Sequence, residues 1–137
     1  MILPVVQERM EALLRQPALE SALAELRSGG RRAGISGLRD VSKALVAAYF
    51  AHELRRPAFL ITESNRRAES IAETLQFFSS IFPGANGGAG VLPAFDSLPW
   101  EPRSPHPDIL ERRAATLYRL AAGQVSLVVA PVAAAFT

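Results

Sequence analysis

Two short, continuous apolar runs constrain the fold of this chain more than any other feature. Residues 57–62 read Pro-Ala-Phe-Leu-Ile-Thr, and residues 126–130 read Ser-Leu-Val-Val-Ala. Such runs are typical of parallel strands that are buried on both faces of a sheet. Two weaker strand patterns, at residues 33–36 and at Val91-Leu92, bring the predicted total to four.

Helical patterns separate the predicted strands. Residues 41–54 are apolar on nearly every side, which is typical of a helix buried against a sheet. The next helix is expected to follow an N-cap at Ser64 or Asn65. Its core-facing residues recur at helical spacing and are Ala68, Ile71, Leu75, Phe78 and Phe82.

The last long helix follows an irregular, proline-rich stretch over residues 95–107. Asp108 is predicted as its N-cap, with Glu111 completing a capping box, and Gly123 is predicted to stop it. The residues predicted to form its inner face are Leu110, Ala114, Leu117 and Ala121.

The alternation predicts an α/β fold, in which a parallel sheet is flanked by helices on both faces and joined by right-handed crossovers. Before it, one or two helices are predicted over residues 5–28, divided at Pro17. We therefore divide the chain into an N-terminal helical lead-in, residues 1–32, and a subdomain, residues 33–137. Because Thr137 follows the last predicted strand so closely, we expect a fragment of a longer multidomain protein.

Composition excludes several kinds of chemistry. The chain has no cysteine, which excludes disulfides, Cys-based zinc sites and thiol catalysis. No apolar run approaches the roughly 18 residues of a membrane span, and the first residues lack a signal-peptide pattern. We therefore expect a cytoplasmic protein without a membrane partner. The net charge of +2 gives no overall case for nucleic-acid binding.

The only lysine of the chain lies where a phosphate-binding loop would end. A working loop reads G-x-x-x-x-G-K-[ST], because its backbone N–H groups surround phosphate and its hydroxyl binds Mg²⁺. Here Gly37 and Lys43 are present, but Ser42 replaces the second glycine and Ala44 replaces the hydroxyl residue. Asp40 adds a carboxylate that would repel phosphate. We therefore expect no cofactor and no metal here, and an ordinary strand–helix turn with a chance lysine explains the segment equally well.

A more specific pattern follows a Gly-rich loop predicted at residues 83–90. Residues 92–101 read Leu-Pro-Ala-Phe-Asp-Ser-Leu-Pro-Trp-Glu, and residues 104–109 read Ser-Pro-His-Pro-Asp-Ile. The signature positions are Leu92, Pro93, Leu98, Pro99, Ser104, Pro105, His106, Asp108 and Arg112. Together with the degenerate loop, this spacing resembles the N-terminal, UvrB-like region of bacterial transcription-repair coupling factors over about residues 33–137.

The resemblance implies a RecA-like subdomain of the P-loop NTPase kind, with a degenerate Walker A loop and no catalytic residues. Coupling factors are ATP-dependent DNA translocases that displace stalled RNA polymerase and recruit UvrA for nucleotide excision repair. The family's UvrA-contacting domain and its motor, which uses ATP and Mg²⁺ on DNA, would follow this segment. The piece itself would be a scaffold that packs on other domains of the parent chain. UvrB's intact P-loop is missing, and no lesion-probing hairpin fits before Asp108.

Two other functions stay open. A nucleotide-binding or hydrolysing fragment of a UvrB-like helicase would need Lys43 to bind phosphate. A DNA-binding module would use the exposed-looking arginine pairs, although glutamates lie near them in sequence. These pairs are Arg55-Arg56, Arg66-Arg67 and Arg112-Arg113.

Trp100 and His106 each allow a more specific functional interpretation. Trp100 could stack on a base, but we expect it to fold onto the sheet edge. His106 lies in a proline-rich turn, where we expect it to hydrogen-bond loop carbonyls and not a metal. No serine has a histidine and an acid at a spacing that suggests nucleophilic catalysis.

Overall fold

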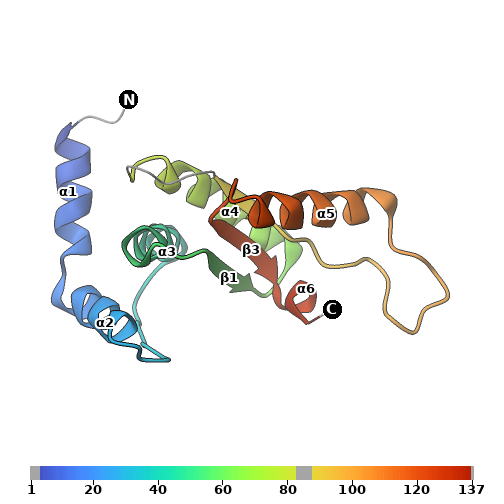
Figure 1. The fold of residues 1–137 in the computed structure, drawn as a ribbon, viewed down its shortest axis with the longest axis horizontal. Coiled ribbons are helices and arrows are strands. Elements are labelled where there is room, and N and C mark those ends of the chain that lie inside the picture. Colours follow the sequence, from blue (N-terminus) through green and yellow to red (C-terminus); the bar gives the residue numbers. More distant parts are fainter. Residues whose placement is uncertain (1–3, 83–87, 137) are drawn as a thin grey trace.

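A computed structural model of the chain describes residues 4–82 and 88–136 (Figure 1). Its elements along the chain are α1 (Pro4–Leu14), α2 (Pro17–Arg27), α3 (Asp40–Leu54), β1 (Ala58–Thr62), α4 (Asn65–Ser79), β2 (Ala89–Val91), α5 (Pro107–Ala121), β3 (Leu127–Pro131) and α6 (Val132–Ala135). The Gly-rich loop predicted at residues 83–90 lies mostly outside the described residues, and its end forms part of β2.

The three strands form a parallel sheet in the order β1-β3-β2. The central strand β3 is buried along its whole length, as its continuous apolar sequence predicts. The α/β class and the strands predicted at residues 57–62 and 126–130 are confirmed. The weak strand predicted at Val91-Leu92 is present but displaced, since β2 ends at Val91.

Helices cover both faces of this sheet. On one face, Leu127 and Val129 of β3 pack with the apolar residues of α3 and α4. On the other, Val128 and Ala130 pack with Leu120 at the end of α5, with Ala134 of α6 and with residues that follow β2. The chain passes from β1 over β3 to β2 and then returns to β3, so right-handed crossovers require α4 and α5 to lie on opposite faces.

The strand predicted at residues 33–36 is wrong, because this segment forms neither helix nor strand. Ala33, Gly34 and Ser36 are exposed, and Ile35 is half-buried. A strand exists only when its backbone pairs with a neighbour, and Gly34 weakens the intrinsic preference for one. No pairing between this segment and β1 occurs within the described part of the chain.

The helical lead-in packs against α3. Pro17 occupies the first turn of α2 and divides it from α1, as predicted. Leu14 and Leu19 form a buried cluster with Val46 of α3. The second apolar side of α3 is therefore covered by α1 and α2, which explains why this helix is apolar on nearly every side.

Helix α4 begins as predicted, with Ser64 as its N-cap. The Ser64 hydroxyl accepts a hydrogen bond from the backbone N–H of Arg67 at 3.2 Å. Ala68, Ile71, Leu75 and Phe78 lie in the core as predicted. Phe82 follows the helix and packs against the same core from the outside.

Helix α5 begins earlier than predicted, because His106 and not Asp108 is its N-cap. The Nδ1 atom of His106 accepts a hydrogen bond from the backbone N–H of Asp108 at 3.3 Å. Pro107 has no N–H group and a fixed φ, which suits it to the first turn of a helix. His106 therefore accepts from a helix N–H group, and the expectation that it donates to loop carbonyls is wrong.

The predicted inner face of α5 is also wrong. Leu110 and Leu117 are 45% and 48% exposed, whereas Thr116 is buried and donates its hydroxyl to the carbonyl of Val91 at 2.7 Å. Gly90 permits this approach, because a Cβ atom at that position would lie 3.1 Å from Cγ2 of Thr116. The close contact between Thr116 and β2 thus determines which face of α5 packs inward. Among the described residues, no helix is both long and apolar enough to cross a membrane.

Candidate functional site

The carboxyl ends of β1 and β3 form the place where this topology is suited to hold a ligand. These strands are neighbours, yet β1 leads to α4 on one face and β3 leads to α6 on the other. In open α/β sheets, ligands bind in the crevice outside strand ends at such a change of direction. Residues from α3, β1 and α4 meet there, and they include Asp40 and Lys43 of the segment at residues 37–44.

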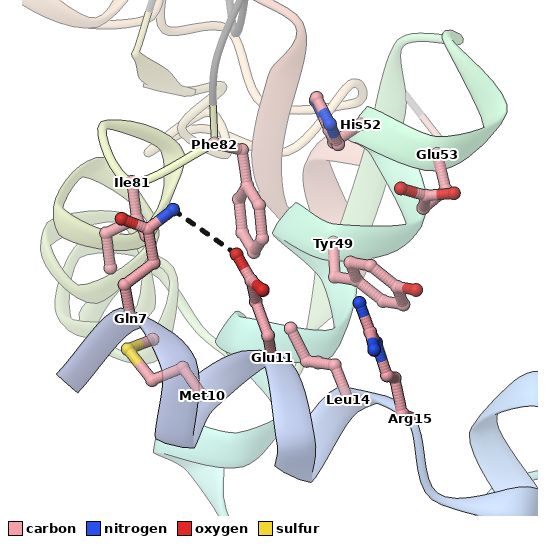
Figure 2. Close-up of a pocket in the computed structure, with 10 residues that line it drawn as sticks. All are labelled: Gln7, Met10, Glu11, Leu14, Arg15, Tyr49, His52, Glu53, Ile81 and Phe82. Atoms are coloured by element: carbon pink, nitrogen blue, oxygen red, sulfur yellow. Dashed lines mark hydrogen bonds between the residues drawn. The ribbon is translucent and has the colours of Figure 1, made fainter. Parts of the chain in front are cut away.

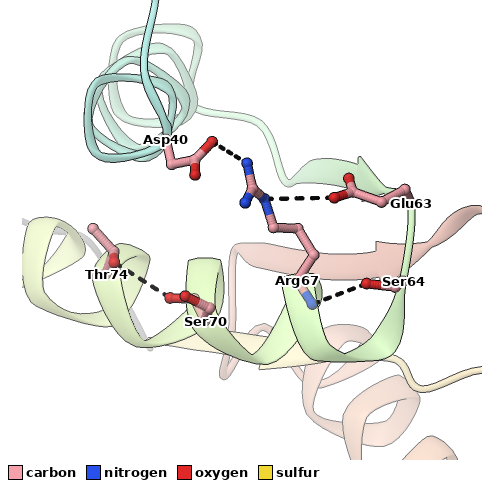
Figure 3. Close-up of polar contacts among 6 residues, drawn as sticks. All are labelled: Asp40, Glu63, Ser64, Arg67, Ser70 and Thr74. Carbon is pink, nitrogen blue, oxygen red and sulfur yellow. Dashed lines mark hydrogen bonds and ion pairs between the residues drawn. The ribbon is translucent and has the colours of Figure 1, made fainter.

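An ion pair occupies the start of α3. The guanidinium Nη2 of Arg67 bonds to the carboxylate of Asp40, which is the first residue of α3 (Figure 3). Arg67 also lies near Glu63, with Nε 3.8 Å from a carboxylate oxygen. A carboxylate in the first turn interacts favourably with the positive end of the helix dipole. Asp40 therefore supplies the negative charge that a phosphate would bring.

The backbone before α3 does not surround an anion as a phosphate-binding loop does. Gly37 has φ +81°, and the helix begins three residues later at Asp40. Lys43 already donates its backbone N–H to the carbonyl of Arg39 at 2.8 Å, and Ser42 lies inside the helix. Ala44 is 0% exposed within the core, so the position of the missing hydroxyl faces away from solvent.

A groove of about 410 Å³ opens beside this ion pair. The charged residues that line it are Asp40, Lys43, Glu63 and Arg67, so their formal charges cancel. The walls are apolar and come from α2, residues 33–38, α3 and β1. Lys43 is exposed and, within the described part of the chain, has no ion-pair partner. Among the described residues, Asp40 and Glu63 both lie beside Arg67, and the sum of the four charges is zero although Lys43 forms no ion pair itself.

The residues of this site offer both polar groups and apolar surface. No three His, Cys, Asp or Glu side chains gather to hold a metal ion in the described ranges. The Thr62 hydroxyl donates to the carbonyl of Ser64 at 3.2 Å and is buried. A ligand in the groove would contact its apolar walls and the exposed Lys43.

The signature segment after β2 forms an ordered loop. Arg113 of α5 donates to the carbonyl of Pro93 at 2.7 Å, and its guanidinium lies 4.2 Å from the ring centroid of Phe95. The backbone N–H of His106 donates to the carboxylate of Asp96 at 3.0 Å, closing the loop at its base. This hydrogen bond is the main reason that the pKa of Asp96 is lowered from its ordinary value.

The signature positions divide between the core and the surface. Leu92 and Pro93 are buried beneath α5, and Arg112 pairs with Glu69 of α4. Asp108 lies exposed in the first turn of α5. The remaining positions are exposed or half-exposed along the loop and are Leu98, Pro99, Ser104, Pro105 and His106.

Trp100 is 77% exposed, so the expectation that it folds onto the sheet edge is wrong. It lies in a turn that Glu101 closes by accepting the backbone N–H of Leu98 at 3.0 Å. This hydrogen bond closes the turn without a contribution from the indole ring, which is exposed to solvent.

The arginine pairs do not form a single basic face. Arg67 and Arg112 are each engaged with a carboxylate of another helix, and Arg113 lies over Phe95. Burial lowers the pKa of Arg113. Arg112 is exposed despite its ion pair, and Arg55, Arg56 and Arg66 are exposed without an ion pair among the described residues. Sequence spacing does not reveal this difference.

A second cavity, of about 250 Å³, lies where α1 packs on α3 (Figure 2). Gln7 donates to Glu11 at 3.3 Å within α1, and the ring of His52 stacks on Phe82 at 5.4 Å between centroids. Burial, followed by the charge of Glu53, raises the pKa of the Tyr49 hydroxyl. Polar and charged residues of the lead-in and of α3 line this cavity together with Met10 and Leu14 of α1 and with Ile81 and Phe82, which follow α4.

No protein-family model, curated protein or solved structure matches this chain.

Proposed function

We infer that this chain is the UvrB-like, RecA-like N-terminal module of a bacterial transcription-repair coupling factor, and that it works as a non-catalytic scaffold. In this proposal the parent protein is an ATP-dependent DNA translocase that displaces stalled RNA polymerase and recruits UvrA. Those partners would be contacted by other domains of the parent chain. ATP and Mg²⁺ would belong to its motor.

The observation that carries the non-catalytic part is the contact between Asp40 and Arg67. Asp40 places a carboxylate at the start of α3, and Arg67 bonds to it there. A nucleotide phosphate would need an empty, electropositive helix end at this point. The burial of Ala44 supports the same conclusion, because a magnesium ligand at that position would face the core. From this geometry together with the sequence, we interpret residues 37–44 as a degenerate Walker A loop.

The loop that carries the signature positions, between β2 and α5, supports the assignment to this family. Pro93, Asp96 and His106 each make a contact that holds the loop against α5 or closes it upon itself. The side chains of Leu98 and Trp100 at its tip are exposed, whereas the backbone of Leu98 is held by Glu101. A scaffold that packs on neighbouring domains would use such a loop.

A chimera tests the proposal. In a bacterial coupling factor of known activity, residues 33–137 of this chain would replace the matching N-terminal segment. The proposal expects that RNA polymerase displacement and UvrA-dependent, transcription-coupled repair are retained. A control chimera carries the same segment with its signature loop, residues 95–105, replaced by a glycine-serine loop of equal length. Loss of repair in both chimeras, with normal folding, would count against membership of this family.

A further inference from the structure

The cavity between the lead-in and α3 has both charged and aromatic walls (Figure 2). Glu11 lies on α1 and Arg15 directly follows this helix, Tyr49 and His52 lie on α3, and Phe82 follows α4. Its volume of about 250 Å³ is near the lower end of the range for small-molecule sites. The mixture of groups therefore raises the question of which small molecule could satisfy all of them.

Glu11 and Arg15 carry opposite charges one helical turn apart, yet they do not pair with each other. The backbone N–H of Arg15 donates to the carbonyl of Glu11 at 3.1 Å, so the helical spacing continues to Arg15. Within the described ranges, neither side chain forms an ion pair, and Glu11 accepts a hydrogen bond from Gln7 at 3.3 Å. An exposed pair at this spacing is weak. A ligand that carries both charges can therefore engage both residues.

The balance of charge around the cavity favours a ligand with one charge of each sign. The charged residues that line it are Glu11, Arg15 and Glu53, and Arg27 pairs with Glu53 from outside the lining. The formal charges of these four residues sum to zero. A simple cation or a simple anion would leave one of the two unpaired side chains without a counter-charge, whereas a zwitterion would not.

Tyr49 adds a hydrogen-bond donor beside Arg15. Figure 2 shows the Arg15 side chain extending toward Tyr49. Burial, followed by the charge of Glu53, raises the pKa of the Tyr49 hydroxyl, so this group is protonated at neutral pH and can donate. A carboxylate at this end of the cavity would meet a guanidinium group and a hydroxyl group together.

Aromatic and apolar side chains form the remaining wall. The ring centroids of Tyr49 and Phe82 lie 5.9 Å apart, and the ring of His52 stacks on the Phe82 ring at 5.4 Å. Met10 and Ile81 line the cavity beside them. These five side chains are half-buried, whereas Glu11 and Arg15 are exposed. The charges therefore lie at the mouth, and the deeper surface suits an aromatic ring.

We propose that this cavity binds a free α-amino acid with an aromatic side chain, of which phenylalanine is the simplest. Its ammonium and carboxylate groups are attached to one carbon atom, which matches two opposite charges one helical turn apart. The ammonium group contacts Glu11, the carboxylate contacts Arg15 and Tyr49, and the ring packs on Phe82. The ligand thus touches the lead-in, α3 and the segment after α4, and it fastens the lead-in to the subdomain. The site is independent of the scaffold role and of nucleotide binding.

The probe for this site is L-phenylalanine, titrated into the chain by calorimetry. Two analogues each lack one charge: phenethylamine has no carboxylate, and 3-phenylpropanoate has no ammonium group. We expect saturable binding of L-phenylalanine with a Kd below about 1 mM, and binding of each analogue at least about fivefold weaker. Absence of saturable binding, or an analogue that binds as tightly as L-phenylalanine, would overturn the proposal.

Two variants assign each charge of the ligand to its residue. In Glu11→Gln, the preference for L-phenylalanine over 3-phenylpropanoate should fall below about twofold, because the ammonium group has lost its counter-charge. In Arg15→Gln, the preference over phenethylamine should fall in the same way. The matched controls Glu8→Gln and Arg9→Gln change exposed residues of α1 that do not line the cavity, so both preferences should persist. If Glu11→Gln and Arg15→Gln keep both preferences, the ligand does not bind as proposed.

A methionine signal locates the ligand on the natural chain. The chain has two methionines, and Met10 lines the cavity. Carbon-13 labelling of the methionine methyl groups therefore gives a simple NMR spectrum, in which Met10→Leu identifies the Met10 signal. We expect this signal to shift as L-phenylalanine is added, because the bound ring lies beside it, and to saturate with the calorimetric Kd. Saturable binding that leaves the Met10 signal unchanged would place the ligand elsewhere and refute this site.

Discussion

Arg67, in the first turn of α4, bonds to the carboxylate of Asp40, the first residue of α3, and this contact ties together the two helix starts that flank the carboxyl end of β1. It joins residues that are far apart in sequence and places the Asp40 carboxylate at the start of α3. The start of α3 is therefore occupied by the chain's own charges. A loop that had only lost its glycine would keep an exposed, electropositive helix end.

Asp40→Asn should lower the free energy of unfolding by about 0.5–1 kcal/mol. It removes the ion pair and the favourable charge at the start of α3, and the value is small because both side chains are more than one-third exposed. Urea denaturation monitored by circular dichroism measures it. Glu63→Gln is the control, because the contact of Glu63 with Arg67 is a loose 3.8 Å. If the two variants are equally stable, Asp40 does not anchor α3.

Ala44→Thr should not restore a magnesium site and should destabilise the fold. Ala44 is fully enclosed among core residues, so the larger side chain must displace its neighbours at a cost of about 1–3 kcal/mol. Ala115→Thr, at an exposed position of α5, reports the helix-propensity cost alone. A fall in melting temperature for Ala44→Thr no larger than that for Ala115→Thr would contradict the enclosed position.

Gly90→Ala should destabilise the chain by about 1 kcal/mol, because its methyl group would meet Cγ2 of Thr116 at 3.1 Å. The hydrogen bond from the Thr116 hydroxyl to the Val91 carbonyl restrains the side chain from turning away. Thr116→Ser removes Cγ2 and keeps that hydroxyl. The cost of Gly90→Ala should therefore shrink in the Thr116→Ser background, and an unchanged cost in a double-mutant cycle would show that the two residues are not in steric contact.

The Asp96 carboxyl should titrate below its ordinary pKa in the folded chain. It accepts the backbone N–H of His106, a hydrogen bond that favours the charged form. A lowered folded pKa gives a stabilising contribution that is present above the unfolded pKa and is lost as the pH falls through the folded one. Carboxyl carbon shifts, followed by NMR in the folded chain and in urea, give both midpoints. Coincident midpoints would mean that the loop closure is absent in solution.

The sequence allowed prediction of the elements whose patterns are local. The strands at residues 58–62 and 127–131 are continuous apolar runs, and Pro17 and Ser64 set the starts of α2 and α4 by their own chemistry. Residues 33–36 have a similar pattern but are not a strand, because pairing depends on a distant partner. The start of α5 was misplaced because Pro107 favours the first turn, so the N-cap falls on the preceding residue.

The inner face of α5 could not be read from periodicity. Its apolar arc is wide, and the helix turns Thr116 inward only because Gly90 leaves space on β2. The pair of Asp40 with Arg67 gave no spacing signal, since the two residues meet only after α3, β1 and α4 have packed. An acid inside a phosphate-loop pattern, with an arginine just after the next strand, is a sequence feature that could have indicated this pair.

A calorimetric titration of this chain with Mg-ATP, run beside Lys43→Ala, tests the non-catalytic scaffold function directly. We predict no heat of binding for either protein, because Asp40 and Arg67 occupy the start of α3 and Ala44 has no hydroxyl group. Binding by the natural chain that disappears in Lys43→Ala would contradict it. That outcome would identify a live nucleotide site and a nucleotide-binding or hydrolysing function in place of a scaffold.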